Sequence, residues 1–172
     1  MVLSAEIKGR FVAPTPMNLP SAYAKLDGLL TTLGAWLQPV LLLVIRLYWG
    51  WAFFLTGKGK LMNLDKTTAF FTELNLPLPK LNAIMAGSTE CVGGLLLLVG
   101  LGSRLVSVPL MFTMGVAYAT AHREELGKIF SDTDKFTEAA PFLFLLASVI
   151  VFAFGPGKIS VDALLGKKSA GK

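Results

Sequence analysis

Four long apolar stretches, separated by charged segments, dominate the chain. The first covers about residues 35–57, the second 81–101, the third 105–122 and the fourth 139–154. A helix rises 1.5 Å per residue, so roughly twenty residues cross a hydrocarbon core of about 30 Å. The pattern therefore predicts an all-α polytopic membrane protein, a bundle of four transmembrane helices with short interfacial helices.

Two amphipathic segments flank the first apolar stretch. Leucines recur at helical spacing after Ser21, and a second amphipathic helix begins at Asn63 or Asp65. We expect the first segment to lie along the membrane surface, and the second to lie along it or to tuck partly into the bundle. The predicted domains are an N-terminal arm with its interfacial helix (1–34), a four-helix transmembrane domain (35–157) and a basic C-terminal tail (158–172).

Composition agrees with a membrane protein because the charges lie almost entirely between the apolar stretches. The chain is 53% hydrophobic and 16% charged, with a net charge of +5. Its lysines flank apolar segments, which favours lipid head groups over nucleic acid as the partner. Its single cysteine, Cys91, and single histidine, His122, argue against a self-contained dithiol, zinc or bis-histidine haem site.

The orientation in the membrane depends on a small charge difference. With four spans, eight Lys and Arg residues lie on the side of the termini and seven lie in the other two connections. The positive-inside rule then gives only a slight preference, and we expect the termini on the cytoplasmic side.

Two ionisable residues lie within predicted spans. Arg46 is about eleven residues from the end of the first span, roughly 16 Å deep, and Glu90 is about nine residues into the second, roughly 14 Å deep. Charge at the bilayer centre is costly, by about 2.5–3.5 kcal/mol on insertion scales. We therefore expect Arg46 and Glu90 to face each other inside the bundle as a hydrogen-bonded pair.

Other residues extend this pair into a predicted pocket. Small residues around Glu90, Gly93 and Gly94 among them, permit close helix approach. The pocket opens on the face that carries the 58–80 connection, with Lys60 and His122 at its mouth. Aromatic side chains line it, and the predicted site residues are Glu90 and His122 as catalytic groups with Arg46, Lys60, Tyr118 and Phe53 as substrate or quinone ligands.

Each of these assignments has a structural alternative. The Arg46–Glu90 pair is also consistent with a staple that fixes helix pairing, and His122 with an ordinary interfacial residue. Lys60 is also consistent with a lysine that snorkels from a helix end. Motifs for nucleotide binding are absent, so any electrons must come through a diffusible quinone or a partner protein, with no covalently bound cofactor.

Four sequence blocks resemble signatures of the DoxX family over about residues 40–165. They are Gly57-Lys58-Gly59-Lys60-Leu61, Glu90-Cys91-Val92-Gly93-Gly94, Gly100-Leu101-Gly102-Ser103-Arg104 and Gly155-Pro156-Gly157-Lys158-Ile159-Ser160-Val161-Asp162. Val99 stands where the family pattern has a leucine. Arg104 closes the third block, and we assign it a structural role together with Gly93 and Gly94. His122 falls where many members place a histidine.

The resemblance implies a four-helix protein of the bacterial or archaeal cytoplasmic membrane. Some relatives are subunits of a thiosulfate:quinone oxidoreductase, and others are found with a superoxide dismutase and a sulfurtransferase. Function is therefore expected to be a membrane subunit of a quinone-linked oxidoreductase, with lipids and redox subunits as partners and self-association left open. The alternatives are a non-catalytic anchor for soluble redox enzymes and a small proton or anion transporter.

Overall fold

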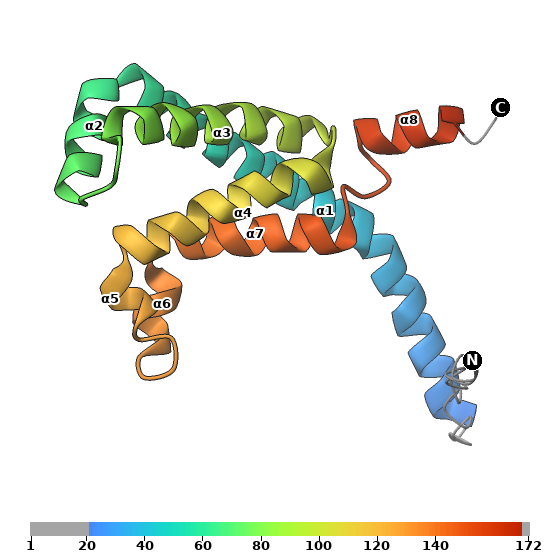
Figure 1. Cartoon of the computed structure of the whole chain (residues 1–172). Coiled ribbons are helices and arrows are strands. Elements are labelled where there is room, and N and C mark those ends of the chain that lie inside the picture. Colours follow the sequence, from blue (N-terminus) through green and yellow to red (C-terminus); the bar gives the residue numbers. More distant parts are fainter. Residues whose placement is uncertain (1–20, 170–172) are drawn as a thin grey trace, which may run out of the picture. The chain divides into compact units, whose positions relative to one another are not determined.

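The computed structural model describes residues 21–169, and within them the chain is entirely helical, without strands. The predicted arm at residues 1–20 and the last three residues, 170–172, lie outside this described range. The helices are α1 (Ser21–Met62), α2 (Leu64–Glu73), α3 (Pro79–Val99), α4 (Ser103–Thr120), α5 (Arg123–Leu126), α6 (Thr133–Glu138), α7 (Pro141–Phe154) and α8 (Val161–Ser169) (Figure 1).

The chain divides into two compact units, residues 1–35 and 36–172. In the first unit, the described leucines of the predicted amphipathic helix are more than half exposed (Leu26, Leu29, Leu30 and Leu33). The described part of α1 runs without interruption from Ser21 to Met62, so α1 does not end near Gly57 as predicted. The predicted interruption between an interfacial helix and the first span is therefore not found.

The other apolar stretches match the predicted helices within two residues at each end. They form α3, α4 and α7. Gly100 and Gly155 end α3 and α7 with φ angles of 75° and 77°, a left-handed region that glycine adopts without steric cost. The predicted helix after Asn63 is α2. Local apolar runs and glycine stops thus predicted these elements well.

Two helices of the described chain are long and apolar enough to cross a membrane. They are Tyr23–Met62, within α1, and α3. Helix α7 is apolar but has 14 residues, fewer than the roughly twenty that a full crossing needs. An all-helical fold with two candidate membrane helices is thus established, and the four-span arrangement remains a prediction.

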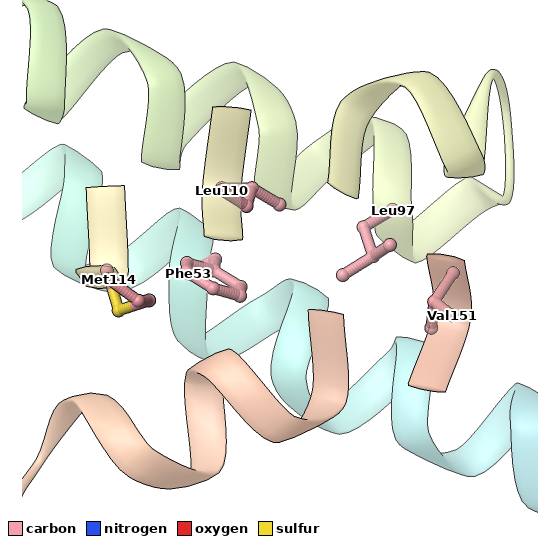
Figure 2. Packing of buried hydrophobic residues seen from close by; sticks show 5 residues of the cluster. All are labelled: Phe53, Leu97, Leu110, Met114 and Val151. Atoms are coloured by element: carbon pink, nitrogen blue, oxygen red, sulfur yellow. The ribbon is translucent and has the colours of Figure 1, made fainter. Parts of the chain in front are cut away.

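In the second unit, α1, α3, α4 and α7 meet around a small apolar core. Side chains from all four helices converge there, as Figure 2 shows (Phe53, Leu97, Leu110, Met114 and Val151). Phe53, Leu97, Leu110 and Val151 are fully buried. This core lies between two polar regions of the bundle, one near each end of α3.

Helices α1 and α3 run antiparallel in close backbone contact. A Cβ atom added to Gly50 would lie 2.8 Å from the Leu98 nitrogen and 2.9 Å from the Gly94 oxygen, and one added to Gly57 would overlap the backbone of Cys91. Contacts this short require glycine. They set the register of the two helices, with Gly50 level with Gly94 and Gly57 level with Gly87 and Cys91.

Candidate functional site

A cavity of about 440 Å³ lies at the end of the bundle where α1 leads into α2. Its walls come from α1, α2, α3, α4 and the start of α7, and most of the lining is apolar. The polar side chains on its wall include Lys60, Asn82, Glu90 and His122. Pockets that bind small molecules have this character, being largely apolar with a few polar groups that orient the ligand.

The central polar feature of the cavity is an ion pair between Lys60 and Glu90. The Lys60 Nζ donates to the Glu90 Oε2 at 2.5 Å. The Glu90 side chain is 2% exposed and that of Lys60 is 30% exposed. Lys60 lies in the last turn of α1, so its long side chain reaches back along the helix to the buried carboxylate. The carboxylate is thus neutralised inside the protein while the ammonium keeps contact with the cavity.

The predicted Arg46–Glu90 pair is wrong. Both side chains are buried, each at 1% exposure, but each has a different partner. Glycine contacts place Gly57 level with Cys91, and Arg46 lies eleven residues before Gly57, roughly 16 Å away along α1. The predicted depths of Arg46 and Glu90 were counted from the estimated ends of their spans. They missed this offset because α1 extends to Met62 and because the glycine contacts between α1 and α3 set the register of the two helices.

Arg46 instead lies at the opposite end of α3, against the C-terminal segment. Its Nη2 donates to the carbonyl oxygen of Ile159 at 2.5 Å, and its Nη1 occupies the space beside Gly100 where a side chain would stand. Among the described residues, Nε and Nη1 have no hydrogen-bond partner. Arg46 therefore binds part of the protein's own backbone and is not a wall of the cavity.

Asp162 completes the junction around Arg46. Its carboxylate accepts hydrogen bonds from the backbone N–H groups of Gly102 (2.7 Å) and Ser103 (3.0 Å) at the start of α4, and its own N–H donates to the Gly100 oxygen (2.9 Å). A carboxylate at a helix N-terminus satisfies unpaired N–H groups and interacts favourably with the helix dipole. Asp162 is thus an N-cap supplied from a distant part of the chain.

The glycine-rich closing block shapes the segment that carries Asp162. Gly155 and Gly157 both have positive φ, and the Ser160 hydroxyl donates to the Gly157 oxygen (2.8 Å). Arg104 lies against Gly155, and its Nη2 donates to the Ala153 oxygen at 3.4 Å near the end of α7. The block that resembles the family signature therefore builds a backbone junction, which includes the predicted structural residue Arg104.

His122 lies on the cavity wall, as the sequence predicts for the pocket mouth. It follows α4 and precedes α5, and its side chain is 29% exposed. Its Nδ1 is 3.7 Å from the Glu125 carboxylate. The cavity thus brings together Lys60, Glu90 and His122, three of the predicted site residues.

The two aromatic site residues lie outside the cavity lining. Phe53 is fully buried in the core, with its ring edge-on to Phe144 at 4.7 Å between centroids. Tyr118 is 2% exposed, stacks on Phe136 at 5.0 Å and donates from its hydroxyl to the Phe136 oxygen. Helical spacing placed both on an inward face, but spacing alone does not distinguish core from cavity wall.

The predicted small residues of α3 contact two different helices. Gly94 lies against the backbone of α1, and Gly93 lies against the Leu110 side chain of α4. Residues that the sequence did not single out supply much of the cavity wall, and α2 contributes Phe70 and Phe71. The amphipathic pattern left open whether this helix lies on the membrane surface or tucks into the bundle, because the choice depends on how α2 folds back beside α3.

The charged connection between α4 and α7 folds as α5 and α6. Phe130, in the turn between them, is 96% exposed. Asp132 is the N-cap of α6, and a hydrogen bond from Lys135 lowers the pKa of its carboxyl. This connection thus presents one bare aromatic ring beside a charged pair.

Comparisons with known proteins identify the family. The DoxX profile matches residues 41–123. The chain is 31% identical over 131 residues to Inner membrane protein YphA of Escherichia coli (strain K12), covering 73% of this chain and 90% of that protein. It is 29% identical over 129 residues to Putative oxidoreductase CatD of Bacillus subtilis (strain 168), covering 74% and 90%. No solved structure matches the chain. With both relatives also in that family, the chain belongs to the DoxX family.

Proposed function

We propose that the protein crosses the cytoplasmic membrane of a prokaryote four times, through α1, α3, α4 and α7. These helices alternate in direction. The charged connection that contains α2 and the one that contains α5 and α6 therefore lie at the same end of the bundle (Figure 1). The relative from Escherichia coli is named an inner membrane protein. The 14-residue α7 spans about 21 Å, which requires local thinning of the bilayer or support from its neighbours. Tags at the two termini, both expected on the cytoplasmic side, would test this topology by their accessibility in sealed cells.

Within this topology, the proposed function is a membrane subunit of a quinone-linked oxidoreductase. The observation that carries the proposal is the apolar cavity with the ion pair between Lys60 and the buried Glu90 on its wall. Its volume of about 440 Å³ falls within the roughly 300–1,000 Å³ typical of ligand sites. The relative from Bacillus subtilis carries the name Putative oxidoreductase CatD, which agrees with redox chemistry at this site.

The polar groups suit the chemistry of a quinone. An ammonium group has three donors, and Lys60 uses one of them on Glu90, so the others can bind a quinone carbonyl. Reduction of a quinone to the quinol takes up two electrons and two protons. The electrons would come from a partner redox protein, and His122 and the Lys60–Glu90 pair would supply protons at the two carbonyls. Arg46, which does not line the cavity, has no part in this proposal.

Binding of a short-tailed benzoquinone to the purified protein tests this function. We expect Lys60→Met and Glu90→Gln to weaken binding at least about tenfold, the loss of a charge-assisted hydrogen bond. Lys58→Met and Glu73→Gln are matched controls because both native side chains are exposed and lie outside the cavity lining. Wild-type affinity in folded Lys60 and Glu90 variants would contradict the proposal.

One observation favours a second function, that of a membrane anchor for soluble redox enzymes. Phe130 is exposed at the tip of the α5–α6 connection, where a partner protein would reach it. In this case, a Phe130→Ser variant would lose soluble partners that co-purify from native membranes, and the Lys60 and Glu90 variants would keep them. Retention of the partners by Phe130→Ser would remove the support for this function.

A further inference from the structure

The cavity has a polar end, at Lys60 and His122, and an apolar end, at Pro109, with the Glu90 carboxylate between them. Its wall follows α4 from Thr120 to Pro109, eleven residues or about 16 Å. His122 and Lys60 lie toward the end at which α1 and α4 finish, while Pro109 and Phe112 lie deeper in the bundle. A ligand that fills this space needs a polar head and an apolar body.

One side of the cavity reaches the outer surface of the bundle between α3 and α4, from Met85, near the level of Lys60, to Phe112 farther in. Met85 of α3 is 57% exposed and Phe112 of α4 is 72% exposed, yet both also line the cavity. In the proposed topology, this outer surface faces acyl chains, so both side chains are in contact with lipid on one side and with the cavity on the other. Such residues form the frame of a lateral opening.

Pro109 adds a local feature to the same region. It lies inside α4 and lines the cavity, and a proline lacks the N–H group that would bond to the carbonyl four residues earlier. The Thr113 hydroxyl donates to the Pro109 oxygen at 2.9 Å, an added bond one turn later that does not restore the one that the proline lacks. Helix α4 is thus adapted at the level of the opening.

We infer that the cavity takes a single-tailed amphiphile directly from the bilayer, with its oxygen-bearing head beside Lys60 and its tail leaving past Met85 and Phe112. This inference rests on the proposed function, and it adds the route and the orientation of the quinone. A tail that stays among acyl chains avoids the cost of transferring apolar surface through water. The head meets the free donors of the Lys60 ammonium at the polar end.

A photoreactive quinone tests the orientation in wild-type protein in lipid nanodiscs. The probe is a benzoquinone with a ten-carbon tail that carries a diazirine at its far end. We expect crosslinks that an unlabelled quinone competes away, located on α4 between residues 109 and 116 and on α3 near Met85. Competed crosslinks on α2 or beside His122 would overturn the inference because the tail would then point toward the polar end.

A matched pair of variants tests whether the quinone probe occupies the cavity beside α4. Ala117 lines the cavity, whereas Ala119 is exposed on the same helix and is not part of the lining. We expect Ala117→Phe to reduce competed crosslinking at least tenfold and Ala119→Phe to leave it unchanged. Equal labelling of the two variants, with both folded, would overturn the inference.

A tail-less benzoquinone separates this inference from the proposed function. If it binds with an affinity that depends on Lys60 while the tailed probe gives no competed crosslink between α3 and α4, the function stands and the route is wrong. If neither quinone binds, the function and the route both fail.

Discussion

Glu90 and Arg46 are both buried at 1% exposure in the same helical bundle, but their surroundings differ. Glu90 is bonded to Lys60 beside a cavity of about 440 Å³. Arg46 is packed against Gly100 and bonded to the backbone of Ile159 in a space that the protein itself fills. Burial of a charged side chain in a membrane protein costs free energy in both cases. We therefore expect each residue to have a role, either in structure or in function. Open space beside the charge is what distinguishes a candidate site from a structural junction.

The largest expected effect comes from removing Arg46. Arg46→Ala loses the bond to Ile159 and leaves a void between α1 and the C-terminal segment, so we expect the free energy of unfolding to fall by about 4 kcal/mol. Quinone affinity of the folded fraction should change by less than about twofold because the cavity is distant. Unfolding in mixed micelles and quinone titration would measure the two quantities. An Arg46→Ala protein with normal stability and no quinone binding would reverse the assigned roles.

The close contact between α1 and α3 sets the helix register that separates Arg46 from Glu90. Substitution of Gly57 tests this contact. A Cβ atom at Gly57 would overlap the α3 backbone, whereas one at Gly59 would meet nothing within 4 Å. We expect Gly57→Ala to lower the free energy of unfolding by about 2.5 kcal/mol, as overpacking does. Gly59→Ala, the control, should raise it by about 0.5 kcal/mol because alanine favours helix. Equal effects in the two variants would mean that α1 and α3 do not pack in this register.

The Lys60–Glu90 pair can be tested by removing one charge or both. Lys60→Met leaves the Glu90 carboxylate buried without its partner, and we expect a loss of about 2 kcal/mol, moderated because Lys60 is partly exposed. The double variant Lys60→Met/Glu90→Leu should recover most of this loss, since no charge then remains buried. Thermal unfolding in detergent would compare the three proteins. A double variant less stable than Lys60→Met would show that the pair is primarily structural.

The smallest effect is expected at Asp162. Asp162→Ala removes the cap of α4 and should cost about 1 kcal/mol, whereas Asp162→Asn should keep most of the stability because asparagine is also a good N-cap. Hydrogen exchange at Gly102 and Ser103 would report the change locally. Unchanged exchange in Asp162→Ala would contradict the capping role.

Helix positions were largely predictable from the sequence, because apolar runs and glycine stops act locally. The ends of α3, α4 and α7 therefore agree with prediction within two residues. The continuation of α1 to Met62 was not predicted, because Gly34 and Pro39 are residues that often interrupt a helix, yet α1 passes through both. A glycine or proline in the pattern thus does not by itself end a helix.

The site was only partly predictable for a geometric reason. Burial of Arg46 and Glu90 follows from their position in apolar runs, but partner choice depends on the register between helices. The register is indicated by pairs of glycines seven residues apart on each helix, Gly50 and Gly57 on α1 and Gly87 and Gly94 on α3. Asp162 caps a helix sixty residues earlier in the chain, a relation with no local signal.

The most direct test of the central claim is quinone affinity measured side by side in Lys60→Met/Glu90→Leu and Asp162→Ala. We expect the first to lose binding at least about thirtyfold while remaining folded, and the second to bind like the wild type despite its lower stability. Normal binding by the double variant, or loss of binding by Asp162→Ala alone, would contradict the assignment of the cavity as the site.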